Sequence, residues 1–277
     1  MSNLAKLYES PLGVARQFAL VITGTAEVRE KASANAHDLK FMQVRAGTAA
    51  YAKCRPEASR LHIEATADAG SNTRIYFLPW SRGSIYRIRP KVGNTVGPDE
   101  NLFFTPNLDG CLVTVEGSPE APTIYHSNSA GIQFTQEEEQ ALGRGPEIRD
   151  VMENRLKIFK MASNVGVFSQ IPPKTPPVVN TPPKRKKDFD IFEYDRGSNQ
   201  QMVLNRFDGI DIDQEVYYGA VFGVRKDGNW TFYKQSFRIV RQERDVEDRG
   251  FFGLSKPQIV RRKQLEYTVA DAKKFWP

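Results

Sequence analysis

Apolar and polar residues alternate in short runs along the first half of the chain, which is the pattern of half-buried β-strands. Gly, Pro, Asn and Asp residues separate the runs, as expected for turns. The strands that this pattern predicts are 15–23, 44–51, 61–65, 74–78, 84–88, 111–115 and 123–126, with a polar or helical stretch at 26–36 after the first. Short strands at this spacing favour an antiparallel sandwich or barrel core.

The hydrophobic period changes after residue 131, where helices are expected within 136–162. Thr135 with Glu138 forms a capping box, and Pro146 suits the first turn of a second helix. In that second helix the apolar residues recur at helical spacing, namely Ile148, Val151, Met152, Leu156 and Phe159. We expect these helices to pack on or beside the sheet.

Strand patterning returns in the last third of the chain. Residues 216–224 and 230–233 are apolar and aromatic, and Asp227-Gly228 lies between them, which is a strong hairpin signal. Another strand is expected at 258–269, and Thr268 with Asp271 predicts a terminal helix. We expect these strands to complete the first sheet, because the strands of the first half are too few and too short to cover their own helices.

The domain organisation follows from one segment of unusual composition. Residues 170–187 contain six prolines and end in Lys184-Arg185-Lys186-Lys187, so they predict a semi-rigid or disordered basic linker. Residues 1–169 then form the first part of the domain that carries the candidate site, and residues 188–277 form a β-rich part that completes it. The expected fold class is α+β, a mostly antiparallel β-sandwich with flanking helices.

Composition narrows the functional classes. The chain has 277 residues and two cysteines, too few for a disulfide framework, which favours a reducing compartment or a fold that needs no bridges. No apolar run reaches the roughly 18 residues that span a bilayer, and no Sec-type signal is visible. The net charge is +6, but the basic clusters at 184–187 and 261–263 are expected to be solvated. No zinc, helix-turn-helix or RNA-binding signature favours nucleic acid.

The strongest candidate chemistry involves one cysteine and one histidine. Cys111 opens one expected strand, His126 closes the next, and turn residues fill 116–122 between them. Antiparallel strands joined in this way place the start of one beside the end of the other. Cys111 and His126 therefore form a candidate thiol nucleophile and general base.

The remaining cysteine and histidines offer weaker alternatives. Cys54 lies between Lys53 and Arg55, which could lower its pKa, but we expect it to be a buried or incidental thiol unless His62 folds back towards it. His37 is expected at the surface, and His62 on the solvent side of a strand. No His-x-His or Cys-x-x-Cys spacing indicates a metal site, and no phosphate-binding or dinucleotide-binding fingerprint is present, so no cofactor is expected.

Residues 103–128 resemble the catalytic segment of the cysteine–histidine glutamine deamidase toxins. The resemblance rests on Leu108-Asp109-Gly110-Cys111, similar to the Leu-Ser-Gly-Cys site of the cytotoxic necrotizing factor catalytic domain and the Burkholderia lethal factor, followed by a histidine that closes the next strand. Asp109 stands where the family has serine. The resemblance implies that Cys111 is the nucleophile, that His126 is its base, and that a backbone carbonyl at Thr105 orients the histidine.

The resemblance also implies a biological setting. Family members deamidate one glutamine of a host protein, either a Rho-type GTPase or a translation-initiation helicase. The chain would then be a secreted effector acting in the host cytoplasm, with a cytoplasmic protein as the alternative. The same Cys–His pair could serve a cysteine protease or a transglutaminase. A non-catalytic binding module remains the competing class, with the aromatic hairpin residues Tyr217, Tyr218, Trp230, Phe232 and Tyr233 as its contact surface.

Overall fold

A computed structural model describes most of the chain outside its middle third. The described residues are 2–33, 37–39, 42–70, 73–81, 84–90, 97–108, 111–128, 187–190, 212–248 and 258–277. Within them, the backbone alone is described for 31–33, 37–39, 42–44, 111–112, 128, 187–190, 212–217, 240–248 and 258–264. The expected helices at 136–162 and most of the linker at 170–187 lie outside the described residues.

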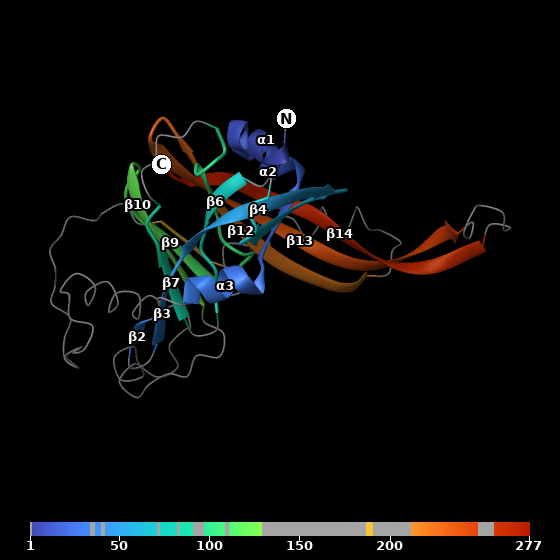
Figure 1. Ribbon diagram of the computed structural model, residues 1–277. Coiled ribbons are helices and arrows are strands. Elements are labelled where there is room, and N and C mark those ends of the chain that lie inside the picture. The colour runs from blue at the N-terminus through green and yellow to red at the C-terminus, as the bar shows by residue number, and fades with distance from the viewer. Residues whose placement is uncertain are drawn as a thin grey trace.

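The described residues are mainly β-structure with a few short helices near the N-terminus (Figure 1). The helices are α1 (Asn3–Glu9), α2 (Pro11–Gln17) and α3 (Ala26–Ser33). The strands are β1 (Ala19–Gly24), β2 (His37–Leu39), β3 (Met42–Ala46), β4 (Thr48–Glu57), β5 (Arg60–Thr66), β6 (Thr73–Phe77), β7 (Ser84–Ile88), β8 (Leu102–Phe104), β9 (Cys111–Ser118), β10 (Ala121–Asn128), β11 (Lys187–Asp190), β12 (Ile212–Lys226), β13 (Asn229–Asp248) and β14 (Gln258–Trp276).

The strands form two sheets. The first has eight strands in the order β1-β5-β4-β6-β8-β12-β13-β14 and curves into a nearly closed, barrel-like wall. The second has the order β11-β9-β10-β7-β3-β2, with β2 and β11 as its shortest members. The pairs β1–β5, β3–β7 and β6–β8 are parallel, and the other described pairs are antiparallel. The mainly β character is confirmed, and the sheets are mixed.

Two hydrophobic cores share one wall. Leu102 and Phe104 of β8 belong to the core inside the curved sheet, whereas Phe103 between them belongs to the core between the two sheets. Alternate residues of a strand point to opposite faces, so a strand buried on both faces has no polar positions. This explains why β8 is a continuous apolar run that the alternation rule did not predict.

The N-terminal helices fill one end of the curved sheet. Ser2 caps α1 by accepting a hydrogen bond from the backbone N–H of Ala5, and Pro11 begins α2, where its missing N–H is not needed. Leu4 and Leu7 of α1 pack into the inner core, each with at most 3% of its surface exposed. The predicted strand at 15–23 is correct only from Ala19 onward, because α2 continues to Gln17.

Side-chain amides hydrogen-bond the backbone N–H and C=O groups on the edge of β1 that does not face β5. Asn107 Oδ1 accepts from the N–H of Ile22 at 2.8 Å, and its Nδ2 donates to the carbonyl of Leu20 at 2.8 Å. Gln235 Oε1 accepts from the N–H of Leu20 at 2.8 Å, and its Nε2 donates to the carbonyl of Phe18 at 2.8 Å. Asn107 and Gln235 therefore replace a neighbouring strand and close the curved sheet at this seam.

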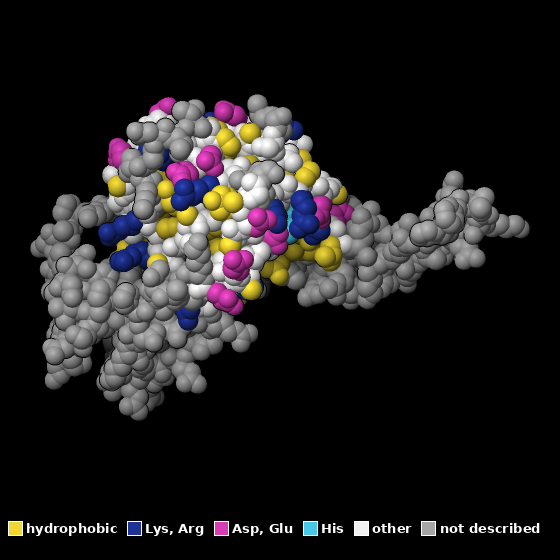
Figure 2. Space-filling model, in the orientation of Figure 1, with side chains coloured by type: hydrophobic (Ala, Val, Ile, Leu, Met, Phe, Trp, Pro, Cys, Tyr) yellow, Lys and Arg dark blue, Asp and Glu magenta, His cyan; other side chains and the backbone are white. Residues whose placement is uncertain are grey.

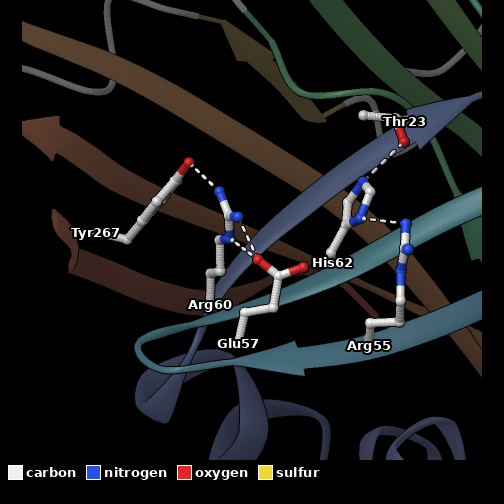
Figure 3. Close-up of polar contacts among 6 residues, drawn as sticks. All are labelled: Thr23, Arg55, Glu57, Arg60, His62 and Tyr267. Atoms are coloured by element: carbon white, nitrogen blue, oxygen red, sulfur yellow. Dashed lines mark hydrogen bonds and ion pairs between the residues drawn. The ribbon is translucent and has the colours of Figure 1, made fainter. Parts of the chain in front are cut away.

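A second contact joins opposite ends of the curved sheet. Arg60 of β5 donates to the hydroxyl of Tyr267 of β14, and its guanidinium lies 4.7 Å from the centroid of the Tyr267 ring (Figure 3). Arg60 also pairs with Glu57, and this hydrogen bond lowers the pKa of the Glu57 carboxyl. Because β5 and β14 lie far apart in the strand order, this contact holds the ends of the sheet together.

The C-terminal strands follow the predicted hairpin. Asp227 and Gly228 both have positive φ, 50° and 81°, as a two-residue turn between right-twisted strands requires. β12 pairs with β8, so β12, β13 and β14 continue the sheet begun in the first half. The predicted terminal helix after Thr268 is wrong, because β14 continues through Asp271 to Trp276 with Val269 paired to Phe237 and Ala272 to Gln235.

Candidate active site around His126

His126 lies in β10 and points into the core between the two sheets. It pairs with Val113 of β9 on one side and with Tyr86 of β7 on the other. Val113 and Tyr86 are both members of the inter-sheet core, and directly opposed residues share a face. The His126 side chain is 0% exposed. The register of the second sheet therefore places an imidazole among apolar side chains.

Leu78 and Thr105, which follow the parallel strands β6 and β8, lie beside this imidazole. β6 pairs with β8 through Phe77 and Phe104, so Leu78 and Thr105 leave the two strands side by side. The Thr105 hydroxyl donates to the Leu78 carbonyl at 2.7 Å and lies 2.5 Å from Nδ1 of His126. The structure thus brings together Thr105 and His126, two of the three residues that the sequence suggested.

The hydroxyl proton determines the histidine tautomer. Thr105 has one hydroxyl hydrogen, which it can donate either to the Leu78 carbonyl or to Nδ1 of His126; when the Leu78 carbonyl accepts it, the Thr105 oxygen accepts a hydrogen bond from Nδ1–H. In the neutral ring Nε2 then carries a lone pair and no proton. Nε2 is buried and has no hydrogen-bond partner among the described residues. The arrangement therefore leaves one basic nitrogen uncommitted.

Burial controls the charge of this histidine. Desolvation lowers the pKa of His126 to about 3, and the Leu78 backbone carbonyl opposes this only in part. The imidazole is consequently neutral near pH 7 and can accept a proton only if a negative charge develops beside it. A thiolate formed by the same proton transfer would be such a charge.

Cys111 is placed near His126 by the backbone register. It is the first residue of β9 and pairs with Asn128, two positions beyond the pairing of Val113 with His126. Residues in this diagonal relation have Cα atoms about 7–8 Å apart. His126 lies two residues before the end of β10 and does not close it, because the pairing with β9 continues to Asn128 opposite Cys111. The Cys111 side chain lies outside the described residues, so contact between its sulfur and the imidazole stays a prediction.

The third member of the site differs in detail from the expectation. The expected contact is the backbone carbonyl of Thr105. In the structure Thr105 contacts His126 through its side-chain hydroxyl, and the backbone carbonyl that this hydroxyl reaches belongs to Leu78. Sequence reasoning did not find Leu78, because a backbone carbonyl leaves no residue signature. Only the parallel pairing of β6 with β8 indicates it.

Cys54 and His62 do not form a second site. Burial raises the pKa of the Cys54 thiol to about 12, so this cysteine is an inert thiol near pH 7. His62 lies between Thr23 and Arg55, with its ring nitrogens 3.1 Å from the Thr23 hydroxyl and 3.4 Å from the Arg55 guanidinium (Figure 3). The side chain of His37, in β2, is outside the described residues. No group of three or more metal-ligating side chains occurs in the part of the chain that the structure describes.

Two of the aromatic side chains of the hairpin are buried in a core. Trp230 and Phe232 are 0% exposed and belong to the inter-sheet core, where their rings stack with centroids 5.9 Å apart. Tyr218 and Tyr233 pack against the other core. Trp230 and Phe232 are therefore unavailable as a contact surface, whereas Tyr218 and Tyr233 are only partly buried.

The described surface on the face in Figure 2 carries both positive and negative side chains. Lys and Arg side chains there are interspersed with Asp and Glu side chains and small apolar patches. Lys53 pairs with Asp68, and Arg74 with Glu100. A net charge of +6 thus does not by itself create a basic docking surface on this face.

Comparison with models of protein families gives no match, and comparison with curated proteins gives no relative. Within the described residues, no helix has the length and apolar character that crossing a bilayer requires.

Proposed function

We propose that this protein is a cysteine-dependent deamidase that hydrolyses a glutamine side chain of a protein target. Cys111 is the nucleophile, His126 is the general base, and Thr105 positions His126. The observation that carries the proposal is the buried imidazole, whose Nδ1 is hydrogen-bonded to the Thr105 hydroxyl while Nε2 has no partner among the described residues. The position of Cys111 on β9, two residues from the Val113 that pairs with His126, supports it.

The chemistry requires these groups and a water molecule. Nε2 of His126 takes the Cys111 thiol proton, and the sulfur attacks the carboxamide carbon of the glutamine. The C–N bond breaks, and ammonia leaves with the proton from the imidazolium. Water, deprotonated by Nε2, then attacks the thioester carbon and releases glutamate and the thiol. The fixed tautomer matters because only Nε2 lacks a proton in the neutral ring.

The same thioester can follow other routes. An amine in place of water gives transglutamination, and a backbone amide in place of the glutamine side chain gives proteolysis. Deamidation is preferred because of the resemblance of residues 103–128 to the deamidase toxins. On the same basis we propose an effector that acts in the host cytoplasm, on a target of the Rho-type GTPase or translation-initiation helicase class.

Intact-mass analysis of candidate targets tests this function. Incubation with the wild-type protein should increase the target mass by about 1 Da per site, since NH₂ is replaced by OH. Cys111→Ser should abolish the change, and Cys54→Ser should not. A mass increase that persists with folded Cys111→Ser protein, or cleavage of the target backbone, would contradict the deamidase assignment.

A further inference from the structure

The outer edge of β9 is occupied by a very short strand from a distant part of the chain. β11, four residues long, pairs antiparallel with β9 from Lys187 opposite Val115 to Asp190 opposite Leu112. β11 is the last strand of its sheet, and no other described strand pairs with β9 on this side. The next register position along β9 beyond Leu112 is Cys111.

A short strand of this kind is held mainly by its backbone. Lys187, Asp188 and Asp190 are charged, and the segment before them is rich in proline. Ladder hydrogen bonds each contribute little net free energy, comparable to the entropy lost when one residue is fixed. Four residues therefore make an occupant that another extended segment can displace, since main-chain pairing does not depend on sequence.

The register also fits the proposed chemistry. An extended segment that follows β11 and is one residue longer would place that residue opposite Cys111. Directly opposed residues share a face, and their Cβ atoms lie about 4.5–5.5 Å apart. A glutamine side chain spans such a separation and brings its carboxamide carbon to the strand opposite. The edge of β9 thus presents a glutamine to the nucleophile without any dedicated pocket.

We propose that the target binds by adding an extended, glutamine-containing segment to the edge of β9, and that β11 is an internal competitor that must leave first. The substrate class is then a loop or unstructured segment of a protein, and not a helix or an internal strand. The chemistry at Cys111 rests on the proposed function, but the strand addition can be tested without it.

Hydrogen exchange of β9 in the Cys111→Ser protein isolates the binding step. The amides within 112–115 that do not pair with β10 should be protected by β11. Asp188→Pro with Phe189→Pro removes two backbone donors, so these amides should exchange roughly tenfold faster or more. Asp188→Ala with Phe189→Ala keeps the backbone donors and is the matched control, with protection close to that of the parent.

A synthetic peptide of residues 184–193 is the probe for addition in trans. It should restore protection of β9 in the double-proline variant and slow the alkylation of Cys111 by iodoacetamide in the corresponding protein that retains this cysteine. Equal exchange of β9 in the parent and the double-proline variant, or no protection by the peptide, would overturn the proposal.

The same peptide with Ile191→Gln, incubated with the double-proline variant that retains Cys111, separates the two proposals: together they predict protection of β9 and a gain of about 1 Da in peptide mass. Protection of β9 without any gain in peptide mass would leave strand addition intact and contradict the deamidase. Deamidation of a target protein by a variant whose β9 never gains protection would retain the enzyme and contradict strand addition.

Discussion

The Thr105 hydroxyl lies 2.5 Å from Nδ1 of His126 and donates its own proton to the carbonyl of Leu78. This contact joins the two sheets through a polar chain inside an apolar core. It favours the tautomer with a proton on Nδ1, because the carbonyl can accept hydrogen bonds and cannot donate them.

Replacement of Thr105 tests this tautomer directly. Thr105→Val is nearly isosteric, but it removes the acceptor for Nδ1–H, and an unsatisfied buried donor costs about 1–3 kcal/mol of unfolding free energy. The ¹⁵N chemical shifts of His126 should indicate an Nε2 lone pair in the parent and a mixture of tautomers in Thr105→Val. Thr105→Ser should retain the parental spectrum. A parental spectrum in Thr105→Val would show that the hydroxyl does not determine the tautomer.

The buried histidine predicts a pH dependence of stability. The pKa of His126 falls from 6.5 to about 3 on folding, so below pH 6.5 the unfolded chain binds a proton that the folded chain does not. Its contribution is therefore constant above pH 6.5, and stability decreases as the pH falls from 6.5 towards 3. Each pH unit within this window costs roughly 1.4 kcal/mol, or about 2 kcal/mol between pH 6.5 and 5. Urea unfolding at pH 6.5 and pH 5 measures this difference in the free energy of unfolding.

His126→Gln provides the control for that experiment, because glutamine keeps a polar side chain that does not titrate. The variant should be less stable at pH 7 but should lose the decrease between pH 6.5 and 5. Persistence of the decrease in His126→Gln would assign it to other groups.

The two cysteines should differ sharply in reactivity. Burial raises the pKa of Cys54 to about 12, so Cys54 should label slowly with iodoacetamide at pH 7. Cys111 should label faster, with a pH midpoint below about 8.5 if His126 accepts its proton. Mass spectrometry of tryptic peptides distinguishes the sites, with Cys111→Ser and Cys54→Ser as mutual controls. Equal labelling of both thiols would contradict an activated Cys111.

Catalytic losses should not add within the Cys111–His126 pair. Cys111→Ser and His126→Gln should each reduce kcat/KM on the target by a factor of about 10³ or more, and the double variant should be no worse than the poorer single variant. Asp109→Ala should have little effect, because the described partners of His126 are Thr105 and Leu78. Losses that multiply in the double variant would indicate that the two residues act independently.

The seam of the curved sheet should depend on Gln235. Gln235→Leu has a similar size but leaves the N–H of Leu20 and the carbonyls of Ala15 and Phe18 without their buried partner. We expect a loss of about 2–4 kcal/mol in urea unfolding. Lys273→Ala is the matched surface control, because its ion pair with Asp271 is more than half exposed, and it should change stability by less than about 0.5 kcal/mol. Equal effects of the two variants would contradict the assigned role of Gln235.

Sequence patterning was most informative where a strand has one buried face or a defined turn. The alternation at 61–65 and the Asp227-Gly228 turn correspond to β5 and the β12–β13 hairpin. It failed at β8, which is buried on both faces and has no alternation. It also failed after Thr268, where the pairing of Ala272 with Gln235 continues β14 despite a local helix-start signal.

By itself the sequence indicated the β character of the described part of the chain and placed Cys111 and His126 on neighbouring antiparallel strands. These properties depend on local periodicity and turns. Only the tertiary structure decided that the first sheet curves until Asn107 and Gln235 complete the edge of β1. It alone decided that Leu78 and Thr105 meet His126, because that contact depends on parallel strands separated along the chain and on the packing of two sheets. Long-range pairing of this kind is set by the burial of whole faces, which no local pattern records.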